Sequence, residues 1–432
     1  RRVLFRSFMK KKSRSLTTKI FIGLILGLIA GIIVYQLPAG TFKDDVLING
    51  IFQFVGQVFL RGIMMMVVPL VFISLVNGAA SMGDVKKLGR VGVRTILFYL
   101  ITTALAVSIA LALGYFLKPG TGLDLEAIEQ VETTVSEKTP LVQILYEMIP
   151  KNPIAAMSEG NMLQIIVFAI ITGIGLSALG DKAKTIIQIF EQLNELVMKM
   201  VGYVMLIAPI GVFGLIAKTF ATVGYSALVP LLKYVATVYI GLIIHAGLVY
   251  SGMLKGFTGL SPKKFYKKFA PAMSVAFSTA SSNATVPINL EITEKKLGVS
   301  KNIAAFTIPL GATINMDGTA IMQGVATFFI AQVYGIPLGI GGILTVVLTA
   351  TLASIGTAGV PGAGAIMLSM VLQSVGLPIE GVGLIMGIDR LVDMGRTTVN
   401  ITGDSVCTII VAKKEGELDE SVFNSDSKSL AK

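Results

Sequence analysis

The stretch Asp393–Asp404, DMGRTTVNITGD, places polar side chains inside an apolar region that extends from Pro378 to Ala412. Together with a preceding aspartate, these polar residues are spaced by four, three, four and four positions, so they share one face of a helix. The residues of this face are Asp389, Asp393, Arg396, Asn400 and Asp404. Each ionised side chain at bilayer depth costs about 3 kcal/mol on an insertion scale, so the face needs partners or water. Ion pairs that merely tie helices together are the alternative, although a buried pair is a weak source of stability.

The composition indicates an integral membrane protein with several spans. Of 432 residues, 53% are hydrophobic and 14% are charged, against roughly 25% charged in soluble chains. The 46 glycines allow membrane helices to approach closely. One cysteine, one histidine and no tryptophan exclude a disulfide framework, a Cys/His zinc site and a haem clamp. We interpret the net charge of +11 as a mark of cytoplasmic loops, not of a nucleic-acid partner.

Six ordinary membrane helices are predicted from apolar runs of about 20 residues. They are Ile20–Leu37, Ile51–Ala80, Val93–Leu117, Met162–Leu179, Ile186–Leu215 and Ala227–Leu254. Lysine and arginine precede the first helix, separate the second from the third and follow the sixth, whereas the connection Leu117–Pro140 is acidic. The positive-inside rule therefore places the N-terminus in the cytoplasm and the acidic connection outside. Residues 1–8 resemble a translated adapter, and we expect Met9 to be the natural start.

The chain beyond about residue 265 is interrupted where it is most apolar. The breaks are FSTASSNATVP at Phe277–Pro287, NMDGT at Asn315–Thr319 and GTAGVPGAG at Gly356–Gly364. The order is hairpin then span, repeated, with a single span between the two hairpins, so the hairpins enter from opposite faces. This order is typical of inverted-repeat transporters, whose broken helices bind solutes near the bilayer midplane.

The polar residues complement an acidic amino acid. The Arg396 guanidinium suits a carboxylate, Asp393 with Thr397 suits an ammonium group, and Asn400 suits a second carboxylate. A dicarboxylate offers no ammonium to Asp393. Asp404, with Asn315 and Asp317, offers oxygen ligands that suit alkali or alkaline-earth cations.

In NMDGT, GTAGVPGAG and DMGRTTVNITGD, the chain resembles the dicarboxylate/amino acid:cation symporter family, which includes archaeal aspartate and animal glutamate transporters. The resemblance covers roughly Leu16–Ala412. It implies an all-α integral membrane fold with eight transmembrane helices, two re-entrant helical hairpins and inverted repeats. It also implies a homotrimer in which a transport domain slides as an elevator against a static scaffold. The hairpin Ile340–Val375 would be the extracellular gate.

The resemblance also implies a substrate site and three sodium sites. The substrate residues would be Ser281, Ser282, Thr319, Val360, Gly364, Asp393, Arg396, Thr397 and Asn400. One Na⁺ site would use Asp404 with carbonyl oxygens of Gly311, Asn315 and Asn400. A second would use carbonyl oxygens of Thr313, Ser354, Ile355 and Thr357. A third would use Tyr99, Thr102, Thr103, Asn315 and Asp317.

One departure from the family pattern concerns an arginine near the site. Archaeal members place it before the serines of the first hairpin tip, and animal members place it in the last helix. This chain has Ala280 and Met394 at those positions, so we expect Arg390 to supply the positive charge. We interpret His245 as a packed residue, and we expect the tail after Lys413 to be disordered.

The sequence thus predicts a sodium-coupled importer of L-aspartate or L-glutamate in the cell (inner) membrane, with both termini cytoplasmic and no enzymatic activity. Proton coupling, or transport of C4-dicarboxylates or neutral amino acids on the same fold, stays open. An ion channel fits less well, because the sequence shows no repeated charged ring and no carbonyl filter. We expect a six-helix region over 9–260, a transport core over 261–412 and a tail over 413–432. The six-helix region would form most of the scaffold, and its third and sixth helices would belong to the transport domain.

Overall fold

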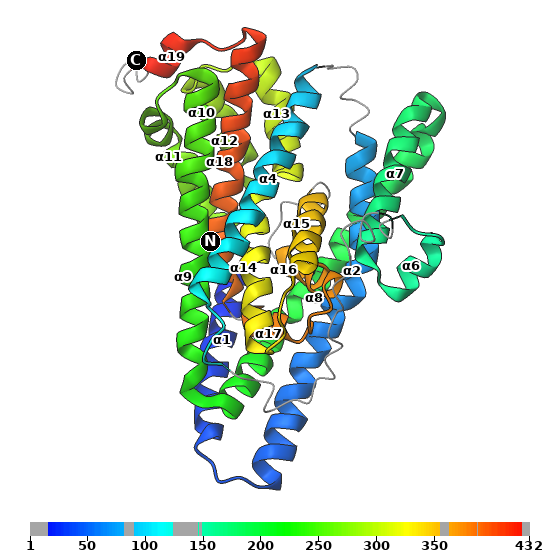
Figure 1. Cartoon of the computed structure of the whole chain (residues 1–432), viewed down its shortest axis with the longest axis vertical. Coiled ribbons are helices and arrows are strands. Elements are labelled where there is room, and N and C mark those ends of the chain that lie inside the picture. The colour runs from blue at the N-terminus through cyan, green and yellow to red at the C-terminus, as the bar shows by residue number, and fades with distance from the viewer. Residues whose placement is uncertain are drawn as a thin grey trace, which may run out of the picture.

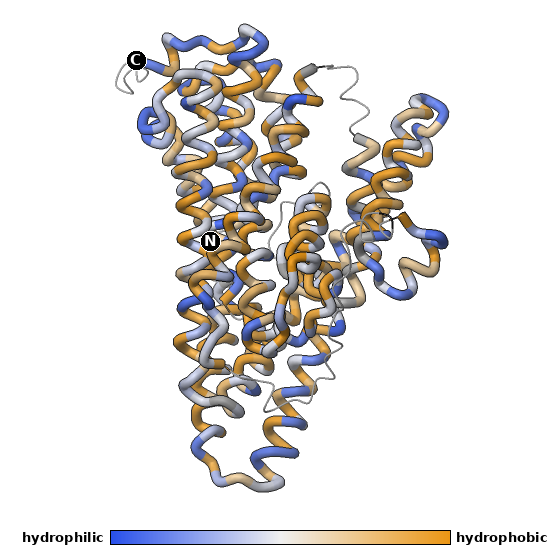
Figure 2. The backbone as a smooth tube through the Cα atoms, viewed as in Figure 1, coloured by the Kyte–Doolittle hydropathy of each residue, from blue (hydrophilic) through white to orange (hydrophobic). Residues whose placement is uncertain are grey.

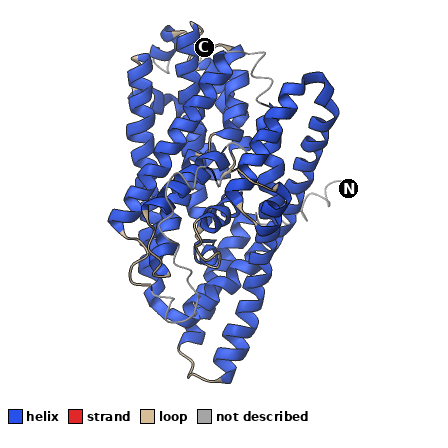
Figure 3. Cartoon of the chain, turned by 45° about the vertical axis from the view of Figure 1, so that its right-hand side comes forward, coloured by secondary structure: helices blue, strands red, loops and turns tan. Residues whose placement is uncertain are grey.

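The computed structural model describes residues 16–81, 90–123, 146, 149–354, 363–386 and 388–425. Within these ranges the chain is helical almost throughout (Figure 3), and the one antiparallel bridge joins Val299 to Leu418. Three groups of predictions lie outside the described residues. They are the adapter-like start at 1–8, the acidic residues of the 124–137 connection, and the hairpin residues Ile355, Thr357 and Val360.

The first half of the chain contains α1 (Leu16–Tyr35), η2 (Phe42–Phe52), α2 (Gln53–Ser81), α4 (Arg90–Leu117), α6 (Pro153–Glu159), α7 (Met162–Leu179), η3 (Gly180–Ala183), α8 (Lys184–Val223), η4 (Gly224–Ala227), α9 (Leu228–Ile244), η5 (His245–Tyr250) and α10 (Ser251–Thr258). The second half contains α11 (Pro262–Thr279), α12 (Ser282–Lys295), α13 (Lys301–Ile314), α14 (Asp317–Val333), α15 (Ile340–Ser354), α16 (Ala363–Ser374), α17 (Gly381–Met386), α18 (Asp389–Glu415) and α19 (Glu420–Asn424). Each of the six predicted apolar helices lies on an observed helix.

Five stretches of the described chain are long and apolar enough to cross a membrane. They are Thr18–Tyr35, Phe42–Asn77, Val91–Leu117, Gln164–Thr222 and Gly224–Thr258. The fourth contains two of the predicted helices, which separate at Gly180. Hydrophobic residues dominate these helices, whereas hydrophilic residues gather around α11 and α19 at one end of the molecule (Figure 2). The chain is therefore a multi-pass membrane protein, and the count of eight spans stays a prediction.

A stripe of glycines brings the first helix against α8. Gly23, Gly27 and Gly31 lie four residues apart on α1, and a Cβ on any of them would come within 2.2 to 2.7 Å of a backbone oxygen of α8. Only glycine therefore fits at these positions, and the two helix backbones touch along about two turns. α2 packs along the same helix, so α1, α2 and α8 form one packed group (Figure 1).

A second group of helices surrounds α14, which is buried along nearly its whole length. α4 and α9 pack against α14, and α18 contacts α14, α13, α12 and α11. The path of α9 continues through the π-helical stretch η5 into α10 without leaving the helix axis. This group contains almost all the described residues that the sequence assigns to the site (Figure 1).

The predicted breaks after residue 265 are present where the structure describes them. α11 ends at Ala280, a non-glycine residue with φ +47°, and Ser281 caps α12 by accepting a hydrogen bond from the N–H of Ala284. α13 ends at Asn315, which has an extended backbone, and α14 begins two residues later. α15 and α16 contact each other, but the 355–362 connection between them lies outside the described residues.

The last predicted helix, Pro378–Ala412, differs from the observed one. The structure contains the short α17 and then a separate α18 that begins at Asp389 and continues to Glu415. Asp389 therefore lies in the first turn of a helix and not in its middle. An acidic group is favourable there because the N–H groups of the first turn point toward it.

The expectation of a disordered tail is wrong for residues 416–425. Leu418 forms the bridge to Val299, the N–H of Asp419 donates to the carbonyl oxygen of Gly298, and Phe423 is fully buried. Lys268 of α11 donates to the carbonyl oxygens of Lys296 and Val422. Polar composition did not prevent order here because backbone pairing and one aromatic anchor hold the segment. We call residues 416–425 the C-terminal clasp.

Candidate functional site

The polar face of α18 points into the protein. Asp389, Asp393, Arg396, Asn400 and Asp404 are each at most 6% exposed, whereas Leu391 between them is 40% exposed. The spacing read from the sequence is therefore confirmed as a single buried face, and none of its charges faces lipid. Buried charges of this kind require partners, which the neighbouring helices and the face itself provide.

Two aspartates and two arginines form a closed ion-pair network. Arg396 donates from Nε to Asp393 Oδ1 at 2.8 Å and from Nη1 to Asp389 Oδ1 at 3.1 Å. Arg390 Nη1 donates to Asp393 Oδ2 at 3.0 Å, and the Thr397 hydroxyl donates weakly to Asp393 Oδ1 at 3.4 Å. The four formal charges cancel. The guanidinium expected to hold a substrate carboxylate is thus held in place by two carboxylates of its own helix.

Arg390 also reaches the turn between α11 and α12. Its Nη2 donates to the carbonyl oxygen of Thr279 at 3.3 Å, next to Ala280, where archaeal relatives of the resembled family carry an arginine. Its Nε is buried without a hydrogen-bond partner among the described residues. The positive charge of Arg390 in α18 therefore lies at the turn between α11 and α12.

The first turn of α12 faces the same region. The Thr285 hydroxyl donates to the backbone carbonyl oxygen of Ser281 at 2.8 Å, while Ser282 is buried. Ala280 adopts the left-handed conformation that non-glycine residues rarely adopt, which turns the chain sharply between the two helices. The expected substrate residues Ser281 and Ser282 thus lie at a helix start close to Arg390.

Asn400 connects α18 to the start of α14. Its Oδ1 accepts from the N–H of Gly318 at 2.7 Å, and its Nδ2 lies 3.4 Å from the sulfur of Met316. The hydroxyl of Thr319, also buried, faces the same sulfur at 3.8 Å. Thioether sulfur is a weak acceptor, so a ligand oxygen would be the better partner for both donors. The expected donor role of Asn400 is compatible with this geometry.

Gly364, near the start of α16, lies directly on Arg396. A Cβ at this position would come within 2.2 Å of Nη1 and 2.6 Å of the guanidinium carbon. α16 therefore contacts the same guanidinium that Asp389 and Asp393 hold. Val360, the other expected residue of this hairpin, lies outside the described residues.

A buried oxygen cluster surrounds Asp404. Asn315 Nδ2 donates to Asp404 Oδ1 at 2.9 Å and to the carbonyl oxygen of Asn400 at 2.8 Å. Asp404 Oδ2 and Asn315 Oδ1 are buried acceptors with no hydrogen-bond donor among the described residues. A Cβ on Gly311 would collide with Asp404 Oδ1 and with the Tyr99 hydroxyl, each at 2.5 Å. These two buried oxygens lack hydrogen-bond donors, and one of them belongs to the carboxyl group of Asp404. Such a pair of oxygens suits a dehydrated alkali cation.

A second carboxylate, Asp317, has a different environment. Its Oδ1 accepts from the Thr103 hydroxyl at 2.6 Å. Its Oδ2 accepts from the Tyr250 hydroxyl at 2.7 Å and lies 3.0 Å from His245 Nε2. The expected residues Tyr99, Thr102, Thr103, Asn315 and Asp317 are all fully buried, and the structure joins Thr103 to Asp317.

The sequence analysis missed His245 and Tyr250. It interpreted His245 as a packed residue, which its full burial confirms, but it did not expect the contact of His245 with Asp317. The two residues are five positions apart, and ordinary helix periodicity places such residues on different faces. A π-helical stretch brings them together, and nothing in the local sequence indicates that stretch.

All three expected cation sites stay predictions, and the structure describes only part of the second one. Thr313 is exposed, and its hydroxyl donates back to Pro309 in its own helix. Ser354 is buried at the end of α15, and Ile355 and Thr357 lie outside the described residues.

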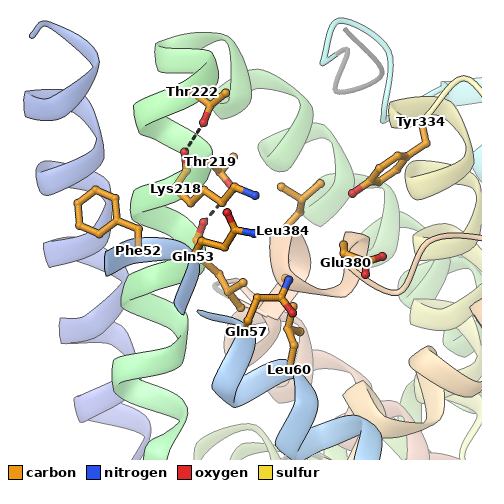
Figure 4. A pocket seen from close by; sticks show the side chains of 12 residues that line it. Phe52, Gln53, Gln57, Leu60, Lys218, Thr219, Thr222, Tyr334, Glu380 and Leu384 are labelled. Carbon is orange, nitrogen blue, oxygen red and sulfur yellow. Dashed lines mark hydrogen bonds between the residues drawn. The ribbon is translucent and has the colours of Figure 1, made fainter. Parts of the chain in front are cut away.

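A cavity of about 70 Å³ lies elsewhere, where α2, α8 and α17 meet (Figure 4). Gln53, Gln57, Lys218 and Glu380 contribute polar groups to its lining. It includes none of the residues assigned to substrate or cations. The candidate site is therefore the packed polar interior between α11–α12, α14, α16 and α18.

The chain is similar to known symport and transport proteins. Residues 16–414 match the model of the "Sodium:dicarboxylate symporter family". A proton/sodium-glutamate symport protein of Geobacillus stearothermophilus is 38% identical over 413 residues, which are 94% of this chain and 96% of the relative. A proton/glutamate-aspartate symporter of Escherichia coli is 35% identical over 95% of both chains. A C4-dicarboxylate transport protein of Bacillus subtilis is 34% identical over 95% of this chain and 96% of the relative.

Proposed function

Because the chain belongs to the sodium:dicarboxylate symporter family, a family of transporters and not of enzymes, we propose that it is a sodium-coupled secondary-active symporter that imports L-aspartate or L-glutamate. The observation that carries the proposal is the buried pairing of Asp393 with Arg396 at 2.8 Å. This pair offers one charge of each sign to a zwitterion. Gly364 and the first turn of α12 lie close enough to contribute backbone groups.

The charges favour an acidic amino acid over a plain dicarboxylate. Asp389 and Asp393 balance the two arginines, so a dianion entering the network meets two carboxylates and no uncompensated cation. An amino acid brings an ammonium group that compensates Asp393 while its carboxylate approaches Arg396. The Asn400 amide nitrogen and the Thr319 hydroxyl, which both face the Met316 sulfur, provide donors for the second carboxylate.

Sodium is supported as the coupling ion by the unpaired oxygens of Asp404 and Asn315. A proton would satisfy one oxygen of Asp404 but would leave the amide oxygen of Asn315 without a donor. A sodium ion satisfies both. Glutamate relatives that carry both proton and sodium in their names keep proton coupling as the alternative.

Coupling between cation and substrate follows from shared residues. Asn315 holds both Asp404 and the backbone carbonyl of Asn400, and the Asn400 side chain fixes the start of α14. A cation at Asp404 therefore orders Asn400 and Thr319 before substrate arrives. Each ligand then favours the other, as thermodynamic linkage requires.

The proposal includes the family architecture: eight spans, two re-entrant hairpins around α11–α12 and α15–α16, and a homotrimer in the cell membrane with cytoplasmic termini. α1, α2 and α8 would belong to the static scaffold. The helices around α18 would move as the transport domain. An elevator mechanism requires two groups of helices that can slide past each other. The helices of each group pack closely among themselves, and the contacts between the two groups are smaller.

Transport of C4-dicarboxylates is the second candidate, because relatives at 34% identity carry that name. Purified protein in proteoliposomes separates the candidates. We expect uptake of labelled L-aspartate to require an inward sodium gradient, and excess succinate to compete far less than L-glutamate. Uptake driven by a proton gradient without sodium, or equal competition by succinate, would contradict the proposal.

A further inference from the structure

The contacts of Asp317 differ from those of Asp404 in one respect. Asp404 has an oxygen without a donor, whereas both oxygens of Asp317 accept hydrogen bonds. Tyr250 and His245 meet on Oδ2, and Thr103 contacts Oδ1. The carboxylate, which belongs to α14, is thus held from two sides by groups of two other elements, η5 and α4.

The π-helical stretch is what allows His245 and Tyr250 to meet. Its wider turn places residues five apart on one face, and the two rings lie 4.6 Å apart in an edge-to-face arrangement. π-helical turns are rare and occur frequently at functional sites, because they cost stability that an ordinary helix would not lose. The stretch aims two donors at one carboxylate oxygen.

His245 acts on Asp317 as a neutral donor. Its Nε2 faces Asp317, and its Nδ1 is buried with no hydrogen-bond partner among the described residues. A doubly protonated imidazole would leave a buried N–H without an acceptor, which is costly. With the proton on Nε2, only a lone pair lies unpaired, and the imidazole donates to Oδ2.

Tyr250 also contacts the other polar motif. A Cβ on Gly403 of α18 would come within 2.3 Å of the Tyr250 hydroxyl and 2.5 Å of Asn315 Nδ2. The hydroxyl is therefore wedged between Asp317 of α14 and the backbone of α18, close to the Asp404 cluster. A tyrosine at this place fixes the position of Asp317 relative to α18 and its Asp404 cluster.

We propose that His245 and Tyr250 are positioning residues for the Asp317 carboxylate, which they orient to bind a transported alkali cation on its Oδ1 edge beside Thr103. The inference rests on the proposed sodium coupling and adds two residues that contact the ligand carboxylate and not the ion. Partners of this kind commonly change metal affinity by about 10- to 100-fold.

The test compares the sodium dependence of wild type, Tyr250→Phe, His245→Ala and His245→Gln in proteoliposomes. We expect the first two variants to raise the Na⁺ concentration for half-maximal aspartate uptake about tenfold or more. The KM for aspartate at saturating sodium should stay within about twofold. His245→Gln should restore the wild-type sodium dependence, because its amide nitrogen donates from about the position of Nε2.

Tyr266→Phe is the matched control. The Tyr266 hydroxyl donates to the carbonyl oxygen of Ala246, within the same π-helical stretch, at 2.6 Å. Its loss disturbs the stretch without touching Asp317, so sodium dependence should be unchanged. A shift in this variant equal to that of Tyr250→Phe would overturn the proposal in favour of general distortion.

Sodium-dependent thermal stabilisation of the purified protein gives a readout without transport. Wild type should gain melting temperature in NaCl over choline chloride, and Tyr250→Phe should require about tenfold more sodium for the same gain. A wild type indifferent to sodium in both assays would contradict the proposed function. A sodium-dependent wild type with unshifted Tyr250→Phe and His245→Ala would contradict this inference alone.

Discussion

Gly364 of α16 lies against the guanidinium group of Arg396 in α18, with room for a hydrogen atom and not for a methyl group. The contact joins the second hairpin to the charge network that holds the substrate in the proposed function. A small change in the hairpin therefore acts directly on the guanidinium.

Replacing Gly364 with alanine should weaken substrate binding. The added Cβ would lie 2.2 Å from Arg396 Nη1, so either the hairpin or the guanidinium must shift. We expect a KM for aspartate about tenfold higher, equivalent to about 1.4 kcal/mol. Gly175→Ala is the control, because a Cβ there meets no atom within 4 Å. Equal KM values in the two variants would show that the contact does not matter.

Replacing Asp404 with asparagine should reduce sodium-dependent stabilisation. The amide keeps the shape of the side chain but removes the charge that attracts the cation. A site saturated 100-fold above its Kd stabilises by about 2.7 kcal/mol, and thermal unfolding in NaCl against choline chloride measures this gain. Glu291→Gln on the exposed surface of α12 makes the same chemical change and should keep the gain. A D404N protein that sodium stabilises as much as wild type would contradict a cation site at Asp404.

Replacing Arg390 with alanine should slow uptake. Asp393 would lose one of its two guanidinium partners, and the turn at Thr279 would lose its positive neighbour. We expect an initial rate about tenfold lower, the loss equivalent to about 1.4 kcal/mol. Adding Met394→Arg to this variant should restore part of the rate. Unchanged transport and sodium dependence in Arg390→Ala would reject the role of this arginine.

Replacing Phe423 with alanine should destabilise the protein without changing substrate affinity. The ring is fully buried in the C-terminal clasp, and Lys268 lies 5.9 Å from its centroid. Truncation of a buried phenylalanine costs about 3 kcal/mol or more. Thermal unfolding in detergent should show a lower Tm, while Ser425→Ala, which removes a hydroxyl bonded within its own segment, should not. Equal melting temperatures would mean that the clasp contributes little.

The C-terminal clasp contains the short helix α19, and Asp419 caps the N-terminus of this helix. Its carboxylate accepts from the Ser421 hydroxyl and from the N–H groups of Val422 and Ser421, and these bonds lower its pKa below the ordinary value. The carboxylate therefore stays ionised and caps α19 at physiological pH.

The most accurate predictions from the sequence rest on helix periodicity and on the free-energy cost of placing charge in a bilayer. The face of α18 and the break at Asn315 follow from these two facts alone. The sequence could not predict contacts created by irregular backbone. His245 and Tyr250 meet only through a π-helical stretch. The order of the clasp depends on a distant backbone bridge, which composition does not reveal.

The balanced network on α18 has a consequence for membrane voltage. The two arginines cancel Asp389 and Asp393, so Asp317 and Asp404 remain as the uncompensated buried charges of the described site. On the proposed function, sodium ions bound at these two carboxylates would compensate their charge in the loaded carrier. The empty carrier would return without those ions and therefore with more uncompensated negative charge at this site. An inside-negative potential would act on that return step, by about 2.3 kcal/mol per charge for each 100 mV.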